Sequence, residues 1–309
     1  MGEDATLGGR ISRRDSLRAL SALSALSALP MLVPGVSVAQ PAKTAARPRV
    51  ALVLGSGSAR GFAHIGVIKA LEAAKIKPDL IVGTSAGAMI GAFYAAGFTG
   101  AQMEELALKV KDIDIVDMQS GAKRGMVMGD TLQSFVNRAT RDRLIEQLGI
   151  PFIAVATQLR TGEVKTFRSG DLGLAVRASC SVPGVFIPPK INEIDYVDGA
   201  LVSPVPVRIA RDAGADFVIA VDVSTGPLNA TPVGIYEQVM HSFDIMGRSL
   251  AKIEAEQADV VIRPDLARLT STDFNARSAF IQIGQSAGTR FAPVVTEKLQ
   301  AWRGPKKSA

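Results

Sequence analysis

The sequence is poor in the side chains on which several familiar chemistries depend. It has one cysteine, Cys180, so a disulfide within the chain is excluded, and two histidines, His64 and His241, so a histidine base has few candidates. Cys180 lies in the run A-S-C-S-V-P, where we expect a small packed thiol rather than a nucleophile. Runs of basic residues interleaved with aromatics are absent too, so we expect no nucleic-acid partner.

What the sequence does contain is typical of a globular protein. The 309 residues are 47% hydrophobic and 21% charged, which is enough apolar material for a sizeable buried core. The formal net charge of +6 suits an anionic membrane surface, although the plainer explanation is a solvated surface with a small excess of Lys and Arg.

The first 39 residues have the pattern of an export signal. The paired Arg13 and Arg14 precede an apolar stretch from residue 19 to residue 38, which ends in the small residues at 37–39. This order is typical of a signal peptide, and the paired arginines resemble a twin-arginine signal. We therefore expect residues 1–39 to direct export to the periplasm or beyond; the alternative is a disordered or amphipathic arm.

The rest of the chain predicts one domain. No later run reaches 18 uninterrupted apolar residues, so we expect no transmembrane helix in the mature chain. Residues 40–48 are expected to be a linker and residues 49–222 the catalytic core. Residues 223–309 are expected to be a helical continuation of the same domain.

Strands and helices alternate after residue 48. Short apolar or alternating runs predict strands at residues 49–54, 79–82, 151–159, 163–167, 194–197, 216–222 and 259–263. Helical spacing predicts helices at residues 61–74, 85–96, 102–111, 130–139, 171–179, 207–213, 235–256 and 278–302, with a loop at 119–129. This alternation predicts an α/β fold with a mainly parallel sheet.

A G-x-S-x-G motif, Gly83 to Gly87, lies between a predicted strand and a predicted helix. On such a turn the central serine, Ser85, is held in a strained conformation and exposed at the end of the sheet. The flanking Gly83 and Gly87 allow the tight turn, and the helix N-terminus directs free N–H groups at a developing oxyanion. Ser85 is our candidate nucleophile; the alternative is a serine that only caps a helix.

A second glycine-rich turn, G-S-G-S-A-R-G at residues 55–61, also joins a strand to a helix. A dinucleotide-binding fingerprint needs its third glycine where Arg60 stands, and a P-loop needs a lysine followed by Ser or Thr. The remaining functional interpretation is a nest of backbone N–H groups for an oxyanion, and the structural alternative is a simple tight turn.

A nucleophilic serine also needs a base. Ser85, Asp198 and His241 follow the order of an α/β-hydrolase triad, but His241 lies in a predicted helix, whereas the histidine of such a triad normally lies on a loop. Asp198 ends a predicted strand and precedes Gly199, so a turn exposes a carboxylate that can take the serine proton directly. The plain explanation of the Asp-Gly pair is an ordinary turn.

Together these motifs resemble those of the patatin-like phospholipase family, including its bacterial branch. The G-x-S-x-G motif of that family matches residues 83–87, and its D-G-G or D-G-A motif matches Asp198-Gly199-Ala200. Its oxyanion loop, G-G-G-x-R-G, aligns with residues 56–61, so two of its glycines are serines here. The resemblance covers roughly residues 49–222 and implies a three-layer α/β/α patatin-like fold with a mainly parallel central sheet.

The resemblance also implies the chemistry. Ser85 would be the nucleophile and Asp198 its base, with the N–H groups of Gly57, Ser58 and Ala86 as the oxyanion hole. The implied reaction is hydrolysis of fatty-acyl esters of (lyso)phospholipids or related lipids at a membrane surface, through an acyl-enzyme and without a metal or other cofactor.

Further expectations concern the surroundings of this dyad. Arg60, next to Gly61, is expected to steady the turn or to contact a lipid phosphate. Residues 125–128 and 182–189 are candidates for an acyl groove. Two alternatives stay open, namely an esterase with a Ser–Asp–His triad that uses His241 and a non-catalytic lipid-binding relative.

Overall fold

A computed structural model describes residues 47–111, 116–118, 124–224 and 234–304. The expected export signal, most of the expected linker and the first part of the predicted loop at 119–129 lie outside these residues. The strands form one mixed sheet in the order β5-β6-β3-β2-β1-β7-β8, with β4 paired to β3 off this path. The strands are β1 (Val50–Leu54), β2 (Leu80–Thr84), β3 (Phe152–Gln158), β4 (Val164–Phe167), β5 (Lys190–Ile191), β6 (Ile194–Asp198), β7 (Phe217–Val221) and β8 (Val260–Ile262).

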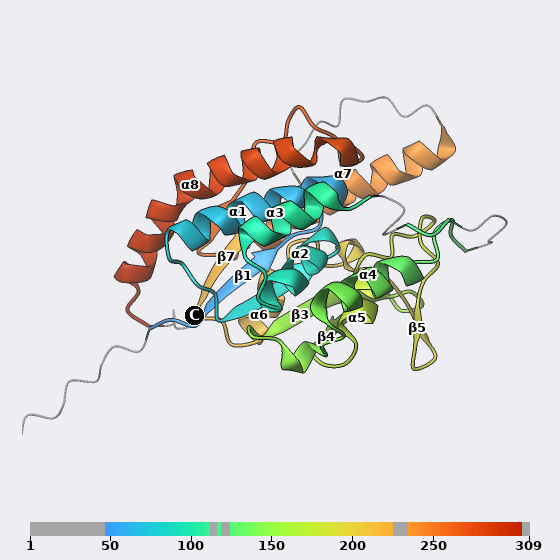
Figure 1. The fold of residues 1–309 in the computed structure, drawn as a ribbon, viewed down its shortest axis with the longest axis horizontal. Helices are drawn as coiled ribbons and strands as arrows, with labels where there is room; N and C mark the ends of the chain where they lie inside the picture. The colour runs from blue at the N-terminus through green and yellow to red at the C-terminus, as the bar shows by residue number, and fades with distance from the viewer. Residues whose placement is uncertain (1–46, 112–115, 119–123, 225–233, 305–309) are drawn as a thin grey trace, which may run out of the picture. The chain divides into compact units, whose positions relative to one another are not determined.

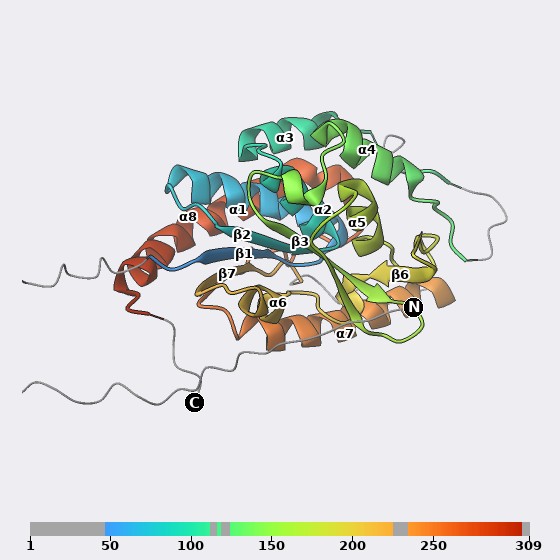
Figure 2. The ribbon, with the colours of Figure 1, turned by 90° about the horizontal axis from the view of Figure 1, so that it is seen from below.

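Helices cover both faces of this sheet (Figures 1 and 2). They are α1 (Phe62–Ala73), α2 (Ala86–Ala95), α3 (Gly100–Lys109), α4 (Asp130–Thr140), α5 (Leu172–Ser179), α6 (Val207–Asp212), α7 (Ile235–Ala255) and α8 (Arg277–Ala301). Figure 2 shows α6 and α7 on one side of the sheet and the other helices on the opposite side. The three-layer fold inferred from the sequence is therefore confirmed.

The side chains of the central strands alternate between two cores. Leu52 and Leu54 of β1 belong to the core under α1, α2 and α8, whereas Ala51 and Val53 belong to the core that includes residues of α6 and α7. This alternation follows from the two-residue period of a strand. Helices cover both faces of the parallel strands, so side chains on either face are buried. All residues of β1, β2 and β7 are accordingly buried.

The parallel part of the sheet comprises β3, β2, β1, β7 and β8, and β4 and β6 run antiparallel to β3. β2 pairs with residues 152–155 of β3 and β4 with residues 154–157, so β2 and β4 lie on opposite edges. β6 pairs with residues 156–158, which places it on the edge of β2. The two strands therefore approach end to end, and their last residues, Thr84 and Asp198, lie opposite neighbouring residues of β3.

The first helix is fixed by very close packing against the last one. A Cβ atom on Gly66 of α1 would lie 1.9 Å from the carbonyl oxygen of Ile281, and one on Gly284 of α8 would lie 2.0 Å from that of Ala63. No larger side chain fits such an approach, so these glycines set the distance between the two helices. Since α1 follows the glycine-rich turn, this contact anchors the turn.

The observed boundaries differ from the expected ones in a few places. α3 begins at Gly100 rather than 102, because Thr99 and Gln102 form a capping box. The two-residue strand β5 was not expected. The last helix, expected over residues 278–302, spans residues 277–301 and includes Pro293. Within the described ranges no helix combines the length and apolar character that crossing a bilayer requires.

Candidate active site

Ser85 lies on the turn between β2 and α2 in a strained backbone conformation. Its φ and ψ are 55° and −124°, a region that non-glycine residues rarely adopt, and only 8% of its surface is exposed. The two motif glycines allow this geometry through close contacts. A Cβ on Gly87 would lie 2.1 Å from the Leu54 carbonyl oxygen, and one on Gly83 would lie 2.4 Å from the Gly87 carbonyl oxygen.

Asp198 meets Ser85 directly. Ser85 Oγ donates a 2.6 Å hydrogen bond to Asp198 Oδ2, and the N–H of Ala200 donates a 2.8 Å bond to Asp198 Oδ1. The end-to-end approach of β2 and β6 explains how two residues 113 positions apart come into contact. Because this bond is direct, no imidazole of the described residues lies between Ser85 and Asp198.

The environment of Asp198 makes it a stronger base than an ordinary aspartate. Its side chain is buried, with 3% of the residue exposed, and none of the described cations forms an ion pair with it. Burial raises the pKa of Asp198 to about 6, although the hydrogen bonds from Ser85 and Ala200 act in the opposite direction. The carboxylate is therefore ionised at neutral pH and still has appreciable proton affinity.

Neither histidine takes part in this contact. His64 is fully buried, its Nε2 lies 2.8 Å from the Gly55 carbonyl oxygen, and burial lowers its pKa to about 4. His64 is thus a neutral ring that is hydrogen-bonded to the first residue of the glycine-rich turn. His241 lies within α7, and in the part of the chain that the structure describes no hydrogen bond joins it to Ser85 or Asp198.

The glycine-rich turn abuts the serine turn. A Cβ on Gly61 would lie 2.4 Å from the Cβ of Ala86, and one on Gly57 would lie 2.5 Å from Val223 Cγ2. Ser58 has a φ of 52°, in the region that favours glycine, although a serine stands there. Among the described residues the N–H groups of Gly57, Ser58 and Ala86 have no protein acceptor, so they are available to a ligand.

Arg60 ties the same turn to α7. The residue is 5% exposed, and its guanidinium group lies 3.4 Å both from the Ser224 carbonyl oxygen and from Asp244 Oδ1. Burial lowers the pKa of Arg60, partly offset by Asp244 and Asp222. Arg60 Nε has no partner within the described residues.

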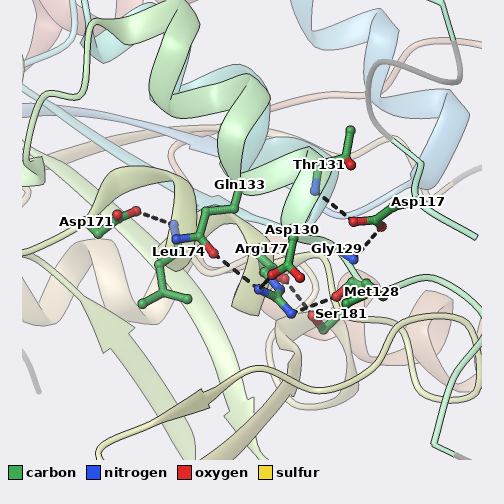
Figure 3. A network of polar contacts seen from close by, with 10 residues as sticks. All are labelled: Asp117, Met128, Gly129, Asp130, Thr131, Gln133, Asp171, Leu174, Arg177 and Ser181. Atoms are coloured by element: carbon green, nitrogen blue, oxygen red, sulfur yellow. Dashed lines mark hydrogen bonds and ion pairs between the residues drawn. The ribbon is translucent and has the colours of Figure 1, made fainter. Parts of the chain in front are cut away.

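A polar network centred on Arg177 joins α5 to α4 and to the loop before α4 (Figure 3). Arg177 binds Asp130 and Gln133 of α4 and donates a 2.7 Å bond to the Met128 carbonyl oxygen. Asp117 accepts the N–H groups of Gly129 and Thr131 at 2.6 and 2.9 Å, and so caps the start of α4. These contacts fix α5 against α4 and the preceding loop.

The C-terminal end of α5 and the residues just after it contact both Ser85 and Asp198. The N–H of Ser85 donates a 2.8 Å bond to Ser179 Oγ, and the N–H of Asp198 donates a 2.8 Å bond to the Ser181 carbonyl oxygen. Cys180 lies between them, and burial together with the Asp198 charge raises the pKa of its thiol well above the usual value. No sequence motif points to Ser179, which lies in the run of small residues A-S-C-S-V-P at 178–183.

The two segments expected to line an acyl groove lie against each other. The N–H groups of Met126 and Val127 donate to the Val185 carbonyl oxygen at 2.8 and 2.9 Å, and the Ile187 N–H donates to the Val127 carbonyl oxygen at 2.8 Å. Met126 and Met128 are 43% and 36% exposed. In the described residues no cluster of three or more His, Cys, Asp or Glu side chains offers a metal site.

A family model and similar proteins both point to one family. The model of the patatin-like phospholipase family matches residues 52–211. The chain is 34% identical over 231 residues to patatin-like phospholipase domain-containing protein 6 of Homo sapiens, a match that covers 72% of this chain and 16% of that protein. It is 37% identical over 183 residues to an uncharacterised NTE family protein of Mycobacterium tuberculosis, covering 57% of this chain and 49% of that one.

Solved structures show more distant likeness. VipD from Legionella pneumophila aligns with a TM-score of 0.47 and 12% identity, over 80% of this chain and 67% of that one. ExoU of Pseudomonas aeruginosa, in complex with SpcU, aligns with a TM-score of 0.47 and 16% identity, over 82% of this chain and 53% of that one. The chain thus spans only about one sixth of the mammalian relative and about half of the mycobacterial one.

Proposed function

Because this chain belongs to the patatin-like phospholipase family, we propose that it is a serine acyl hydrolase that cleaves fatty-acyl esters of (lyso)phospholipids or related lipids. Ser85 is the nucleophile and Asp198 the base of a Ser–Asp dyad. The observation that carries the proposal is the 2.6 Å hydrogen bond from Ser85 Oγ to Asp198 Oδ2. The raised pKa of Asp198, about 6, supports its role as proton acceptor near neutral pH.

In the acylation step Ser85 Oγ attacks the ester carbonyl carbon while Asp198 takes the hydroxyl proton. The carbonyl π electrons move onto oxygen, and the resulting oxyanion accepts hydrogen bonds from the N–H groups of Gly57, Ser58 and Ala86. The intermediate then expels the alkoxide, which receives the proton from Asp198. The product is an ester between the fatty acid and Ser85.

Deacylation repeats these steps with water. Asp198 takes a proton from water, which attacks the acyl carbon, and returns it to Ser85 Oγ as the fatty acid leaves. Every proton moves between Asp198 and the reacting oxygen, so the scheme needs neither a histidine nor a metal. Among the described residues no cation forms an ion pair with Asp198, whereas Asp222 pairs with Arg263. This difference supports a role of Asp198 in proton transfer rather than in an ion pair.

The proposal also includes the place of action. The signal-like pattern of residues 1–39 favours export, and the lipid substrate favours work at a membrane surface. The experiment below distinguishes this function from two alternatives, namely a Ser–Asp–His esterase that uses His241 and a lipid-binding relative without turnover.

The decisive experiment is covalent labelling with a fluorophosphonate probe, together with turnover of a p-nitrophenyl ester and of lysophospholipid. Wild type and His241→Ala are expected to be labelled alike, whereas Ser85→Ala is unlabelled and loses about 10⁴-fold or more in kcat. Loss of activity in His241→Ala would favour the triad. Lipid binding by the wild type without labelling or turnover would favour the non-catalytic relative.

A further inference from the structure

We propose that Ser179, the last residue of α5, is a positioning residue for this reaction: its hydroxyl group holds the backbone of the nucleophile. This inference rests on the proposed function of Ser85. It assigns a role to a side chain outside all three motifs that the sequence revealed, and it comes from a hydrogen-bond chain that joins β3 to the serine turn.

Two short hydrogen bonds meet at one oxygen atom, Ser179 Oγ. The N–H of Ser85 donates to Ser179 Oγ at 2.8 Å, and Ser179 Oγ donates to the Val155 carbonyl oxygen at 2.6 Å. Ser179 has no exposed surface, so no water competes for either bond. Val155 belongs to β3, the strand whose edge carries both β2 and β6.

The direction of these bonds follows from the chemistry of a hydroxyl group. A serine hydroxyl has one hydrogen and two lone pairs, and the Val155 carbonyl group can only accept. The single hydrogen of Ser179 is therefore committed to Val155, and a lone pair faces the N–H of Ser85. Ser179 Oγ can therefore only accept a hydrogen bond from the Ser85 N–H, and this bond holds the peptide group between Thr84 and Ser85 in one orientation.

This contact has two consequences for the reaction. First, it fixes the peptide on the N-terminal side of Ser85, whose φ of 55° is unfavourable and needs support from the surrounding structure. Second, it occupies the Ser85 N–H, so that group cannot serve as an oxyanion donor. Of the three N–H groups proposed as oxyanion donors, those of Ala86, Gly57 and Ser58, none has an acceptor among the described residues.

Ser179 is itself well fixed. Asp171 caps the start of α5 by accepting the N–H of Leu174 at 2.6 Å, and Arg177 joins the helix to α4. Just beyond the helix, Ser181 Oγ donates a 2.7 Å bond to the Arg177 carbonyl oxygen (Figure 3). The hydroxyl group of Ser179 is thus presented from a helix end that is anchored on both sides.

The test compares Ser179→Ala and Ser179→Cys with wild type, using p-nitrophenyl butyrate. Alanine removes the acceptor, and cysteine supplies a weaker one of similar size. We expect kcat to fall about 10- to 100-fold in Ser179→Ala and less in Ser179→Cys, with KM unchanged, because misplacing the nucleophile impairs the chemical step rather than binding. The matched control is Thr140→Val, which removes a buried hydroxyl group that bonds only within α4 and should leave kcat within about twofold.

Hydrogen–deuterium exchange separates this inference from the proposed function. The Ser85 amide should be protected in wild type and should exchange faster in Ser179→Ala but not in Thr140→Val. If the wild type shows no turnover, the proposed hydrolase function is refuted. The exchange rate of the Ser85 amide still tests its hydrogen bond to Ser179 in that case. A kcat in Ser179→Ala equal to that of wild type, or a rise in KM alone, overturns the positioning role, and Ser179→Cys decides if the alanine variant does not fold.

Discussion

Two buried aspartates at the ends of strands show how similar local structures serve different purposes. Asp198 ends β6 and is 3% exposed, and Asp222 follows β7 and is 2% exposed. In each, Oδ1 accepts the N–H of the residue two positions later, Ala200 at 2.8 Å and Ser224 at 3.0 Å. Burial and the local turn therefore do not distinguish them.

The second oxygen atom does distinguish them. Asp222 Oδ2 accepts a 3.0 Å bond from Arg263 Nε, so its charge is balanced by a cation. Asp198 Oδ2 accepts from the neutral hydroxyl of Ser85 instead. Burial without a cation favours the neutral form of a carboxyl group, and burial accordingly raises the pKa of Asp198. The comparison thus supports the proposed role of Asp198 in proton transfer, and it predicts a structural role for Asp222.

The largest expected effect is on turnover in a matched pair of variants, Asp198→Asn and Asp222→Asn. Asparagine keeps the shape of each side chain and an oxygen for the local N–H, but it cannot take a proton. We expect Asp198→Asn to lose about 10⁴-fold in kcat, the size seen when a catalytic aspartate becomes an amide, and folded Asp222→Asn to lose less than about 10-fold. The measurement is kcat for ester turnover, with circular dichroism to check that both variants fold. Equal losses of kcat in the two variants would contradict the distinction between the two aspartates.

The next effect is on pH dependence. The pKa of Asp198 is about 6 in the folded protein and near 4 when unfolded, so the folded state binds this proton more tightly. The contribution of Asp198 to stability is therefore fully present below pH 4, falls by about 3 kcal/mol as the pH rises to 6, and is constant above. Its activity runs the opposite way, since kcat/KM should decline below pH 6 as the base becomes protonated.

Urea unfolding of wild type and Asp198→Asn between pH 4 and pH 8 isolates this contribution. The difference in unfolding free energy between them should change by about 3 kcal/mol in favour of the variant as the pH rises. Asp222→Asn serves as the control for a second buried carboxylate. Parallel pH curves for wild type and Asp198→Asn would mean that burial does not raise the pKa of Asp198.

Much of this fold and of the candidate site follows from local sequence. The apolar runs that became β1, β2 and β7 and the turn glycines at 83 and 87 are short-range signals, because strand period and turn geometry depend on neighbouring residues. The earlier start of α3 was also readable, since Thr99 and Gln102 have the spacing of a capping box.

The remainder depends on contacts between distant residues. The sequence alone does not say that β6 lies on the β3 edge occupied by β2, and this placement brings Asp198 to Ser85. Nor does it say that the hydroxyl of Ser179 faces the Ser85 amide or that Arg263 neutralises Asp222. Each of these pairings depends on how separate elements pack, which local propensity does not determine.

The smallest expected effect is on stability and concerns the ion pair of Asp222. Arg263→Ala removes the cation from Asp222 but leaves the bonds from the Ser224 N–H and hydroxyl groups. Because the Arg263 side chain is 41% exposed, water replaces part of what is lost, and we expect about 2 kcal/mol of destabilisation. The pH profile of kcat should be unchanged, because Asp222 takes no part in proton transfer. A shifted profile with intact stability would instead make Asp222 part of the catalytic electrostatics, and the distinction between the two aspartates would fail.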